Sequence, residues 1–431
     1  MTALIGRRGI RVAGVAGLLV ILIAALCGVS PGSRNVIFGG SAPAAAAGVS
    51  GHCSGTPIKL TEIATLTGAE AFPSVSRDYV DGTNAAVKAV NSACTAGRPL
   101  DVIVCDDQSD PNQSTTCGTK AKEDGSLAIF NTLGSYDNGV TASGLPAVLT
   151  QGASQFDLTS PDAYPASSAL VLVLGSVAAA AAAGAKTYLM VAFESPVTQF
   201  LIGEASTLAK QLGVTMTPLY FPADTTDFAP VAAQVAAAKP GSIGLIVTSA
   251  VPFINALAGQ GISPKNVPIF TAVSLIPPDV IHQVGNKIDG AYLISQSVPA
   301  QQTSNPGIKQ MLKEYAAAGI HVKVADIGTA AVAAWSNVHI VGDALSKLSR
   351  SEIKHLTSAG LVKALQALGP VSRPEMAPFN LSKNAFPTNP VLKTLRIFSS
   401  QAMVVRVENG TYEQVSPFGP VTKPFKLDIK H

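Results

Sequence analysis

The sequence is poor in charge: only 13% of its 431 residues are Asp, Glu, Lys or Arg, whereas 47% are hydrophobic. Such a chain can bury a large core, so global disorder is excluded, and its length predicts two domains. Of 30 basic residues, four (Arg7, Arg8, Arg11 and Arg34) lie in an N-terminal segment without acids. The remaining 26 are almost balanced by 27 acidic residues. This balance disfavours nucleic-acid binding, which needs clustered Lys and Arg.

Sequence motifs of common enzymes are also missing. We find no G-x-S-x-G, no H-E-x-x-H, no GxxxxGK[ST] and no tight GxGxxG after a strand. The histidines are scattered over several predicted elements: His52, His282, His321, His339, His355 and His431. We therefore expect no enzyme, no metal site and no cofactor.

Two carboxylate positions could still carry chemistry. Asp106 and Asp107 follow a predicted strand, where a metal or acid/base pair could form. The surrounding letters DDQSDPN are more typical of a turn that leads into a helix. Asp227 likewise favours a helix cap over a ligand contact.

The first 47 residues have the outline of a secretion signal: a basic start, an apolar run over 12–29 and small residues over 44–47. The small residues lie far beyond the apolar run, and that run is long enough for a short membrane span. Cys27 would suit lipid attachment, but Leu26 precedes it where a small residue is expected. We predict export and leave a cleaved leader and a membrane anchor open.

Four cysteines follow this segment, and an even number in an exported chain favours disulfides. Cys53 precedes the first strand and Cys94 ends the first helix, so both lie at one end of the sheet. Cys105 ends the second strand and Cys117 lies in the next helix. We predict the pairs Cys53–Cys94 and Cys105–Cys117. A zinc site is disfavoured because no CxxC and no paired histidines accompany them.

A βαβ unit over 60–110 is the clearest structural pattern. A helix over 74–93 places Val75, Tyr79, Gly82, Ala86 and Val90 on one apolar stripe and leaves a charged back. The run LDVIVC that follows is typical of a central parallel strand buried on both faces. The letters DPN then start a helix, with Asp110 as its cap and Pro111 at its first position.

The alternation of strands and helices continues to residue 296. We expect strands over 127–130, 146–150, 187–193, 214–221, 243–249, 267–272 and 290–296. We expect helices over 169–185, 198–212, 228–238 and 252–260, then over 306–318, 326–347 and 358–368. Asn409-Gly410 predicts a final hairpin. The pattern indicates an α/β fold of parallel sheets covered by helices on both faces.

Three predicted loops should emerge on the same sheet edge, because each follows a strand of this series. They are Gly134-Ser135-Tyr136, Gly152-Ala153-Ser154 and Glu194-Ser195. Hydroxyl groups and backbone amides near helix starts can accept an anion without a basic side chain. The same residues could simply form tight turns.

The segments IKLTEIATLTGAEAF, GRPLDVIVCDDQSDP, PAVLTQGAS, FPADTTDFAP and GAYLISQ, in this order, resemble the type I periplasmic binding proteins of the leucine/isoleucine/valine-binding family. The resemblance covers about 57–415. It implies two doubly wound parallel-sheet lobes joined by three crossovers. Lobe one would comprise 57–167 plus 299–388, and lobe two 168–298 plus 389–425.

The resemblance also implies a binding site. Ser135 matches a serine that binds the ligand carboxylate, with Tyr136 beside it. Gly152, Ala153 and Ser154 match a loop that binds the same group, and Phe72 matches an aromatic wall.

In lobe two the family's amino-acid binders use a carboxylate for the ligand ammonium, but Val273 and Ser274 stand there, and Ser249 stands near a missing aromatic. A buried ammonium without a counter-charge is costly. Either Glu194 replaces the acid or the ligand lacks an ammonium, and we favour the second alternative.

The function that this resemblance implies is solute capture for an ABC importer. The protein would bind a small amino acid, organic acid or amide by hinge closure and deliver it to a membrane permease. We expect an exported monomer, periplasmic or at the cell surface and open to membrane tethering. One alternative is a ligand-sensing regulatory module of the same fold. Another is an exported α/β hydrolase, which would need a histidine near Ser135 or Ser154.

Overall fold

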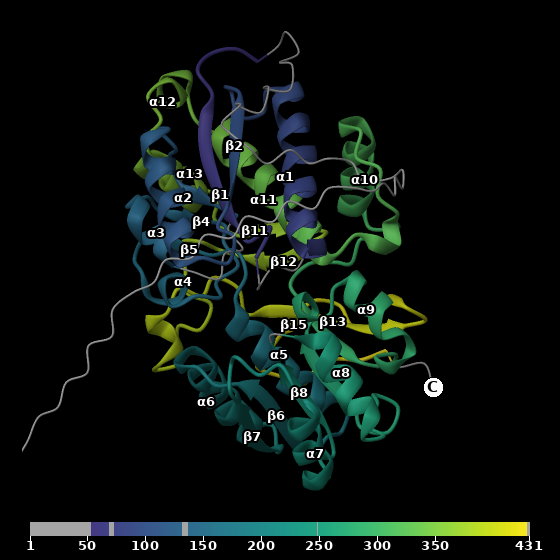
Figure 1. Ribbon diagram of the computed structural model, residues 1–431. Coiled ribbons are helices and arrows are strands. Elements are labelled where there is room, and N and C mark those ends of the chain that lie inside the picture. The colour runs from purple at the N-terminus through teal and green to yellow at the C-terminus, as the bar shows by residue number, and fades with distance from the viewer. Residues whose placement is uncertain (1–52, 69–72, 132–136, 248, 429–431) are drawn as a thin grey trace, which may run out of the picture. The chain divides into compact units, whose positions relative to one another are not determined.

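The computed structural model describes residues 53–68, 73–131, 137–247 and 249–428. Two main sheets with flanking helices organise this part of the chain, which confirms the predicted α/β architecture of two lobes joined by three crossovers (Figure 1). Phe72, Ser135, Tyr136 and the N-terminal segment 1–47 lie outside the described residues.

The first sheet is parallel and has the strand order β2-β1-β3-β4-β5. Its strands are β1 Ile58–Ala64, β2 Leu100–Asp106, β3 Ile129–Phe130, β4 Ala147–Val148 and β5 Ala163–Tyr164. The prediction that LDVIVC is a central strand is wrong, because β2 pairs only with β1 at the sheet edge. A β-branched run predicts a strand but does not say on how many sides that strand is paired.

The parallel part of the second sheet has the strand order β7-β6-β8-β9-β10, which repeats the order of the first sheet. The antiparallel strand β13 pairs with β10, and β14 pairs with β13. These strands are β6 Thr187–Phe193, β7 Thr215–Phe221, β8 Ile243–Ile246, β9 Ile269–Ala272, β10 Tyr292–Ser295, β13 Gln401–Glu408 and β14 Thr411–Gln414. Asn409-Gly410 joins β13 to β14, as predicted. The short strand β15 Gly419–Pro420 pairs with β13.

Each sheet lies between two apolar layers, because successive side chains along a strand point to opposite faces of the sheet. In β1, Leu60 belongs to the core that includes helices α1 and α11, and Ile63 belongs to the core beneath α2. In β6, Val191 and Met190 divide in the same way between two cores. Parallel strands covered on both faces read as nearly continuous apolar runs, which is why the sequence revealed most of them.

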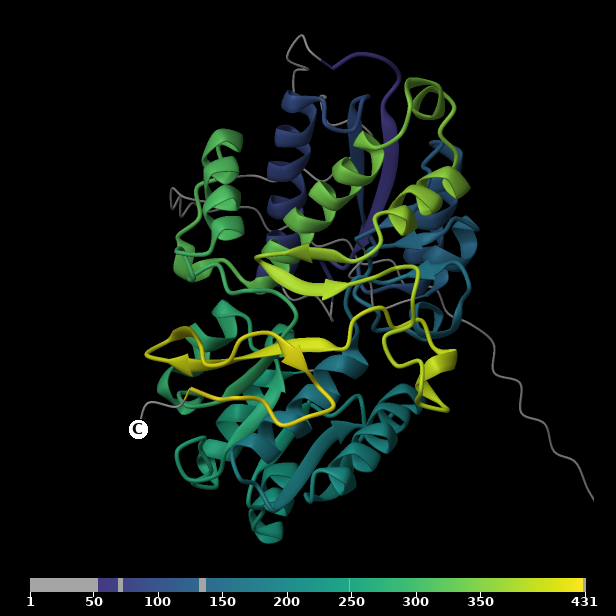
Figure 2. The ribbon, with the colours of Figure 1, turned by 180° about the vertical axis from the view of Figure 1, so that it is seen from behind.

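The helices match most predicted ranges within a few residues. The longer ones are α1 Pro73–Ala93, α2 Pro111–Glu123, α5 Ala169–Ala182, α6 Pro196–Gln211, α7 Ala229–Ala238, α8 Ala250–Gly259, α10 Pro306–Ala318, α11 Thr329–Ser346 and α13 Ser358–Ala367. The sequence did not predict several short elements: α3 Asn138–Ser143, α4 Gln155–Thr159, α9 Pro278–Val284, α12 Arg350–Lys354, and the hairpin of β11 Val371–Arg373 with β12 Met376–Phe379 (Figure 2). In the described chain, no helix combines the length and apolarity needed to span a membrane.

The chain passes between the two sheets three times, over 165–168, 296–305 and 380–400. Gln296, in the second passage, bonds to the first passage and to the residue that follows the third. Its Oε1 accepts a hydrogen bond from the Ser168 N–H (2.8 Å), and its Nε2 donates to the carbonyl of Gln401, the first residue of β13 (3.2 Å). The predicted lobe limits fall within these passages, and we propose them as the lobe boundaries.

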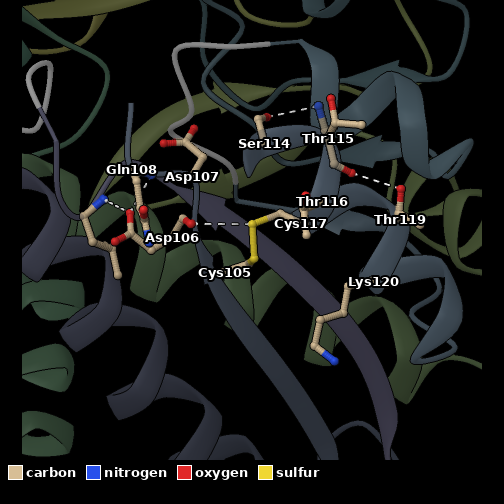
Figure 3. Close-up of a disulfide and its surroundings, with 12 residues drawn as sticks. Cys105, Asp106, Asp107, Gln108, Ser114, Thr115, Thr116, Cys117, Thr119 and Lys120 are labelled. Atoms are coloured by element: carbon tan, nitrogen blue, oxygen red, sulfur yellow. Dashed lines mark hydrogen bonds between the residues drawn. A yellow bond between two sulfur atoms is a disulfide. The ribbon is translucent and has the colours of Figure 1, made fainter. Parts of the chain in front are cut away.

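The disulfides join Cys53 to Cys94 and Cys105 to Cys117, as predicted. The second bond fastens the end of β2 to α2 (Figure 3). It lies beside the turn in which Asp106 accepts hydrogen bonds from the N–H groups of Leu66, Thr67 and Gln108. Asp106 therefore holds a turn, and Asp107 accepts from Ser109 N–H in the same turn. Asp110 caps α2 through Asn112 N–H, as predicted.

Candidate functional site

A cavity of about 240 Å³ lies between the two sheets. Residues that follow β4 and β5 line it on one side, and residues at the ends of β8, β9 and β10 line it on the other. The carboxyl ends of both parallel sheets thus meet at one cavity, the position where open α/β sheets bind their ligands.

The wall from lobe one has a larger share of polar side chains than the wall from lobe two. It consists of loop residues after β4 and β5 and of side chains from α1 and α11, including Tyr79, Thr150, Gln151, Ala153, Thr329 and Asn337. Thr150 donates its hydroxyl proton to Asp157 (2.6 Å). Burial raises the pKa of Asp157, while hydrogen bonds from Thr150 and Ser154 lower it. Asp157 thereby fixes the loop that borders the cavity.

The wall from lobe two is mainly apolar and includes Leu172, Val173, Met190, Leu201, Leu245 and Ile246. Three of its hydroxyl groups donate within the protein: Ser176 to the carbonyl of Val173 (2.7 Å), Thr271 to that of Leu245 (2.8 Å) and Ser295 to that of Ser297 (2.5 Å). Their protons are therefore engaged, and this wall offers a ligand mostly apolar contact.

A buried polar chain lies behind the lobe-one wall. Asn337 donates to Asn131 Oδ1 (2.9 Å), and Asn131 donates to Glu62 Oε2 (3.2 Å). Thr83 also donates to Glu62 Oε2 (2.8 Å). Burial raises the pKa of Glu62 to about 7, although the hydrogen bonds from Thr83 and Asn131 lower it. This carboxyl group therefore changes protonation near neutral pH.

Tyr79 lies on α1 and contributes a buried phenol to the cavity wall. Burial raises its pKa well above the ordinary value, the carboxyl of Glu62 raises it further, and the Gln151 side chain lowers it. The phenol is protonated at neutral pH and can donate a hydrogen bond. The preceding residue, Asp78, accepts from the N–H of Gly328 at the start of α11 (2.9 Å) and fixes α1 against that helix. Asp78 is buried, so the predicted charged back of α1 is wrong at this position.

The predicted site residues take different places. Ala153 and Ser274 line the cavity. Gly152, Ser154, Glu194 and Ser249 are not among the described residues that line it.

These four residues lie in a tight turn, at a helix cap or at exposed positions. Gly152 has a positive φ of 56°, and a side chain there would collide with the carbonyl oxygen of Ser167. Ser154 caps α4 in a capping box with Asp157. Glu194 is exposed and accepts from Gln199 (3.3 Å), and Ser249 is exposed at the start of α8.

Sequence reasoning missed the cavity residues contributed by helices. Tyr79 was assigned to the apolar stripe of α1, and Asn337 was not singled out. Asn337 lies inside the mainly apolar helix α11, where it is 4% exposed. A lone amide in such a helix is a usable signal, because buried polar groups need partners.

The histidines occupy other places. His339 contacts Glu314 Oε2 (2.8 Å), which also accepts from Trp335 (2.6 Å), and so joins α10 to α11. His282 faces Asp326 at 3.7 Å. No described histidine lines the cavity, so the part of the chain that the structure describes offers no nucleophile and base pair there.

The two α/β lobes have the same strand order, and the carboxyl ends of their parallel strands surround one small cavity. This arrangement is that of a two-lobed solute receptor. The chain belongs to the periplasmic binding protein family, whose model matches residues 57–399. This is a family of extracytoplasmic, non-enzymatic solute-binding proteins of ABC transporters. Comparison with curated proteins gives no match.

Solved structures share this type I fold. A solute-binding protein from R. palustris in complex with benzoate is 15% identical, with a TM-score of 0.66 over 86% of this chain and 98% of its own. A fatty acid ABC transporter substrate-binding protein from Thermomonospora curvata is 18% identical, with a TM-score of 0.68 over 86% and 95%. A leucine binding protein from Thermotoga maritima is 14% identical, with a TM-score of 0.64 over 84% and 98%.

Proposed function

We propose that this protein is the extracytoplasmic receptor of an ABC importer, which captures a small amino acid, organic acid or amide and delivers it to a membrane permease. The observation that carries the proposal is the cavity between the carboxyl edges of the two sheets. Ligand docks on lobe one, lobe two rotates over it, and water leaves the cavity. The receptor acts as an exported monomer, either released after cleavage of a leader or tethered to the membrane through the N-terminal segment.

The neighbours in structure guide the choice of test ligands. Their names report benzoate, a fatty acid and leucine. We infer that the ligand here has an apolar body, because the lobe-two wall is mainly apolar and three of its hydroxyl groups donate within the protein. We also infer that it lacks an ammonium group, since Glu194 is exposed and no carboxylate is found among the described lining residues.

Native mass spectrometry of the purified protein tests solute capture, together with thermal shifts for leucine, benzoate and benzamide. We expect Ala333→Trp, which fills the cavity from α11, to remove the ligand signal and the thermal shift. Ala316→Trp, on an exposed face of α10, is the matched control and should retain both. Retention of binding in Ala333→Trp would place the site elsewhere and contradict the proposal.

The absence of an ammonium has its own test. We expect leucine to bind at least tenfold more weakly than an uncharged or acidic ligand of similar size, because a buried ammonium would lack a counter-charge. Isothermal titration measures the two affinities. Tight leucine binding that Glu194→Gln abolishes would show that Glu194 supplies the charge and that our preference is wrong.

A further inference from the structure

The charge of the ligand can be inferred from the cavity, provided that the cavity is the solute site proposed above. No Asp, Glu, Lys, Arg or His is present among the described residues that line it. The undescribed internal residues 69–72, 132–136 and 248 contain one charged residue in the sequence, Glu70, and no basic one. A carboxylate ligand would therefore enter a buried site without a cation, which is unfavourable unless other groups compensate.

The lobe-one wall contains an acceptor without a donor. The amide group of Asn337 has a fixed orientation, because its Nδ2 donates both to Asn131 Oδ1 and to the carbonyl of Leu149, each at 2.9 Å. A carbonyl cannot donate, so the atom next to Leu149 must be the nitrogen. Asn337 Oδ1 is buried and has no hydrogen-bond partner in the described structure. A buried acceptor of this kind is unfavourable when it remains unsatisfied.

The charge behind this wall is negative or neutral. Asn131 connects Asn337 to Glu62, whose Oε1 also lacks a hydrogen-bond partner in the described chain. Glu62 is fully buried, with a pKa raised by burial to about 7. A ligand carboxylate at the lobe-one wall would face this group and would gain no compensation from it.

We propose that the cavity selects an uncharged ligand with a carboxamide-like head on lobe one and an apolar body against lobe two. The head would accept a hydrogen bond from the Tyr79 hydroxyl and donate its N–H to Asn337 Oδ1. A primary amide suits this pair of groups because it carries one acceptor and two donors without charge. A carboxylate carries acceptors only, and an ammonium carries donors only.

Three compounds with the same ring and different heads test the inference: benzamide, benzoate and benzylamine. Isothermal titration at neutral pH should give benzamide at least tenfold higher affinity than either charged compound. Tighter binding of benzoate or benzylamine would overturn the inference and leave the proposed function intact. If none of the three binds, and leucine and a fatty acid also fail, both the inference and the proposed function are contradicted.

Substitutions in the lobe-one wall test which residues bind the head group of the ligand. Tyr79→Phe should weaken benzamide binding about tenfold, whereas Tyr220→Phe, on a strand of lobe two away from the cavity, should leave it unchanged. Asn337→Asp places a carboxylate at the free acceptor and should shift preference from benzamide towards benzylamine. If Asn337→Asp does not fold, the tyrosine pair alone decides: equal affinities of Tyr79→Phe and Tyr220→Phe for benzamide would overturn the assignment.

Discussion

At the scale of single residues, burial decides which groups matter. Glu62 stands inside the apolar-looking strand IKLTEIA, and the sequence could not show that its carboxyl group would have no exposure at all. Alternation along β1 places Glu62 on the same face as Leu60, towards α1, where Thr83 contacts it. The contacts that stabilise it come from Thr83 and Asn131, which are far apart in sequence, so only the folded chain brings them together.

Glu62 makes a testable contribution to the pH dependence of stability. Burial raises its pKa from 4.5 to about 7, so between these values the folded protein keeps a proton that the unfolded chain releases. The free energy of unfolding should therefore fall as pH rises through this window, by up to about 1.4 kcal/mol per pH unit from this group. Denaturation of Glu62→Gln at several pH values should show a flatter dependence.

Asp78 should account for part of the pH dependence of unfolding that remains in Glu62→Gln. Its pKa is also raised to about 7, mainly by burial, so Glu62→Gln should keep part of the decline. Glu123→Gln is the control, because Glu123 is exposed on α2. The same pH dependence in Glu62→Gln as in the unaltered protein would show that Glu62 does not titrate in this window.

At the scale of elements, the sequence predicted the long helices and the parallel strands well because their apolar periodicity is strong. It failed for α4, α9 and α12, which have between five and seven residues and are too short to show a period. It also gave β2 the wrong place, since sheet order depends on which strands pair and not on the composition of one strand. The Tyr79 and Asn337 positions show the same limit: helix periodicity identified a buried face without indicating that a cavity borders it.

The contact between α1 and α11 can be tested through a glycine. Gly82 is buried on α1, and a methyl group there would collide with the carbonyl oxygen of Ala331 on α11. We expect Gly82→Ala to lower the free energy of unfolding by about 1–3 kcal/mol, because the two helices must separate. Gly203→Ala on α6, where nothing lies within 4 Å, should instead stabilise by about 0.5–1 kcal/mol. Urea denaturation measures both, and equal effects would contradict the close packing of α1 on α11.

At the scale of the whole molecule, the order of strands and helices predicted an α/β fold and the length predicted two domains, whereas the family resemblance supplied the two lobes and their connections. The sequence could not show which side chain connects the passages between the lobes. Gln296 does so with one amide, and no local pattern distinguishes it from other glutamines.

We expect Gln296→Ala to lower the free energy of unfolding by about 1–3 kcal/mol, because the Ser168 N–H and the Gln401 carbonyl both lose their partner. Gln199→Ala is the control: its bond to Glu194 is exposed, so the change should be within about 0.5 kcal/mol. Guanidinium denaturation compares the two. A loss in Gln296→Ala as small as in the control would mean that the passages are held by other contacts.

The Gln296 amide also restricts how the two lobes can move. Since Gln296 bonds to the first passage and to the residue that follows the third, none of the three passages can slide past the others without breaking a bond. We propose that the lobes move mainly by rotation about an axis near Ser168, Gln296 and Gln401, a motion that can keep both bonds. We expect solute to enter and leave by the same mouth, on the side of the cavity opposite to that axis.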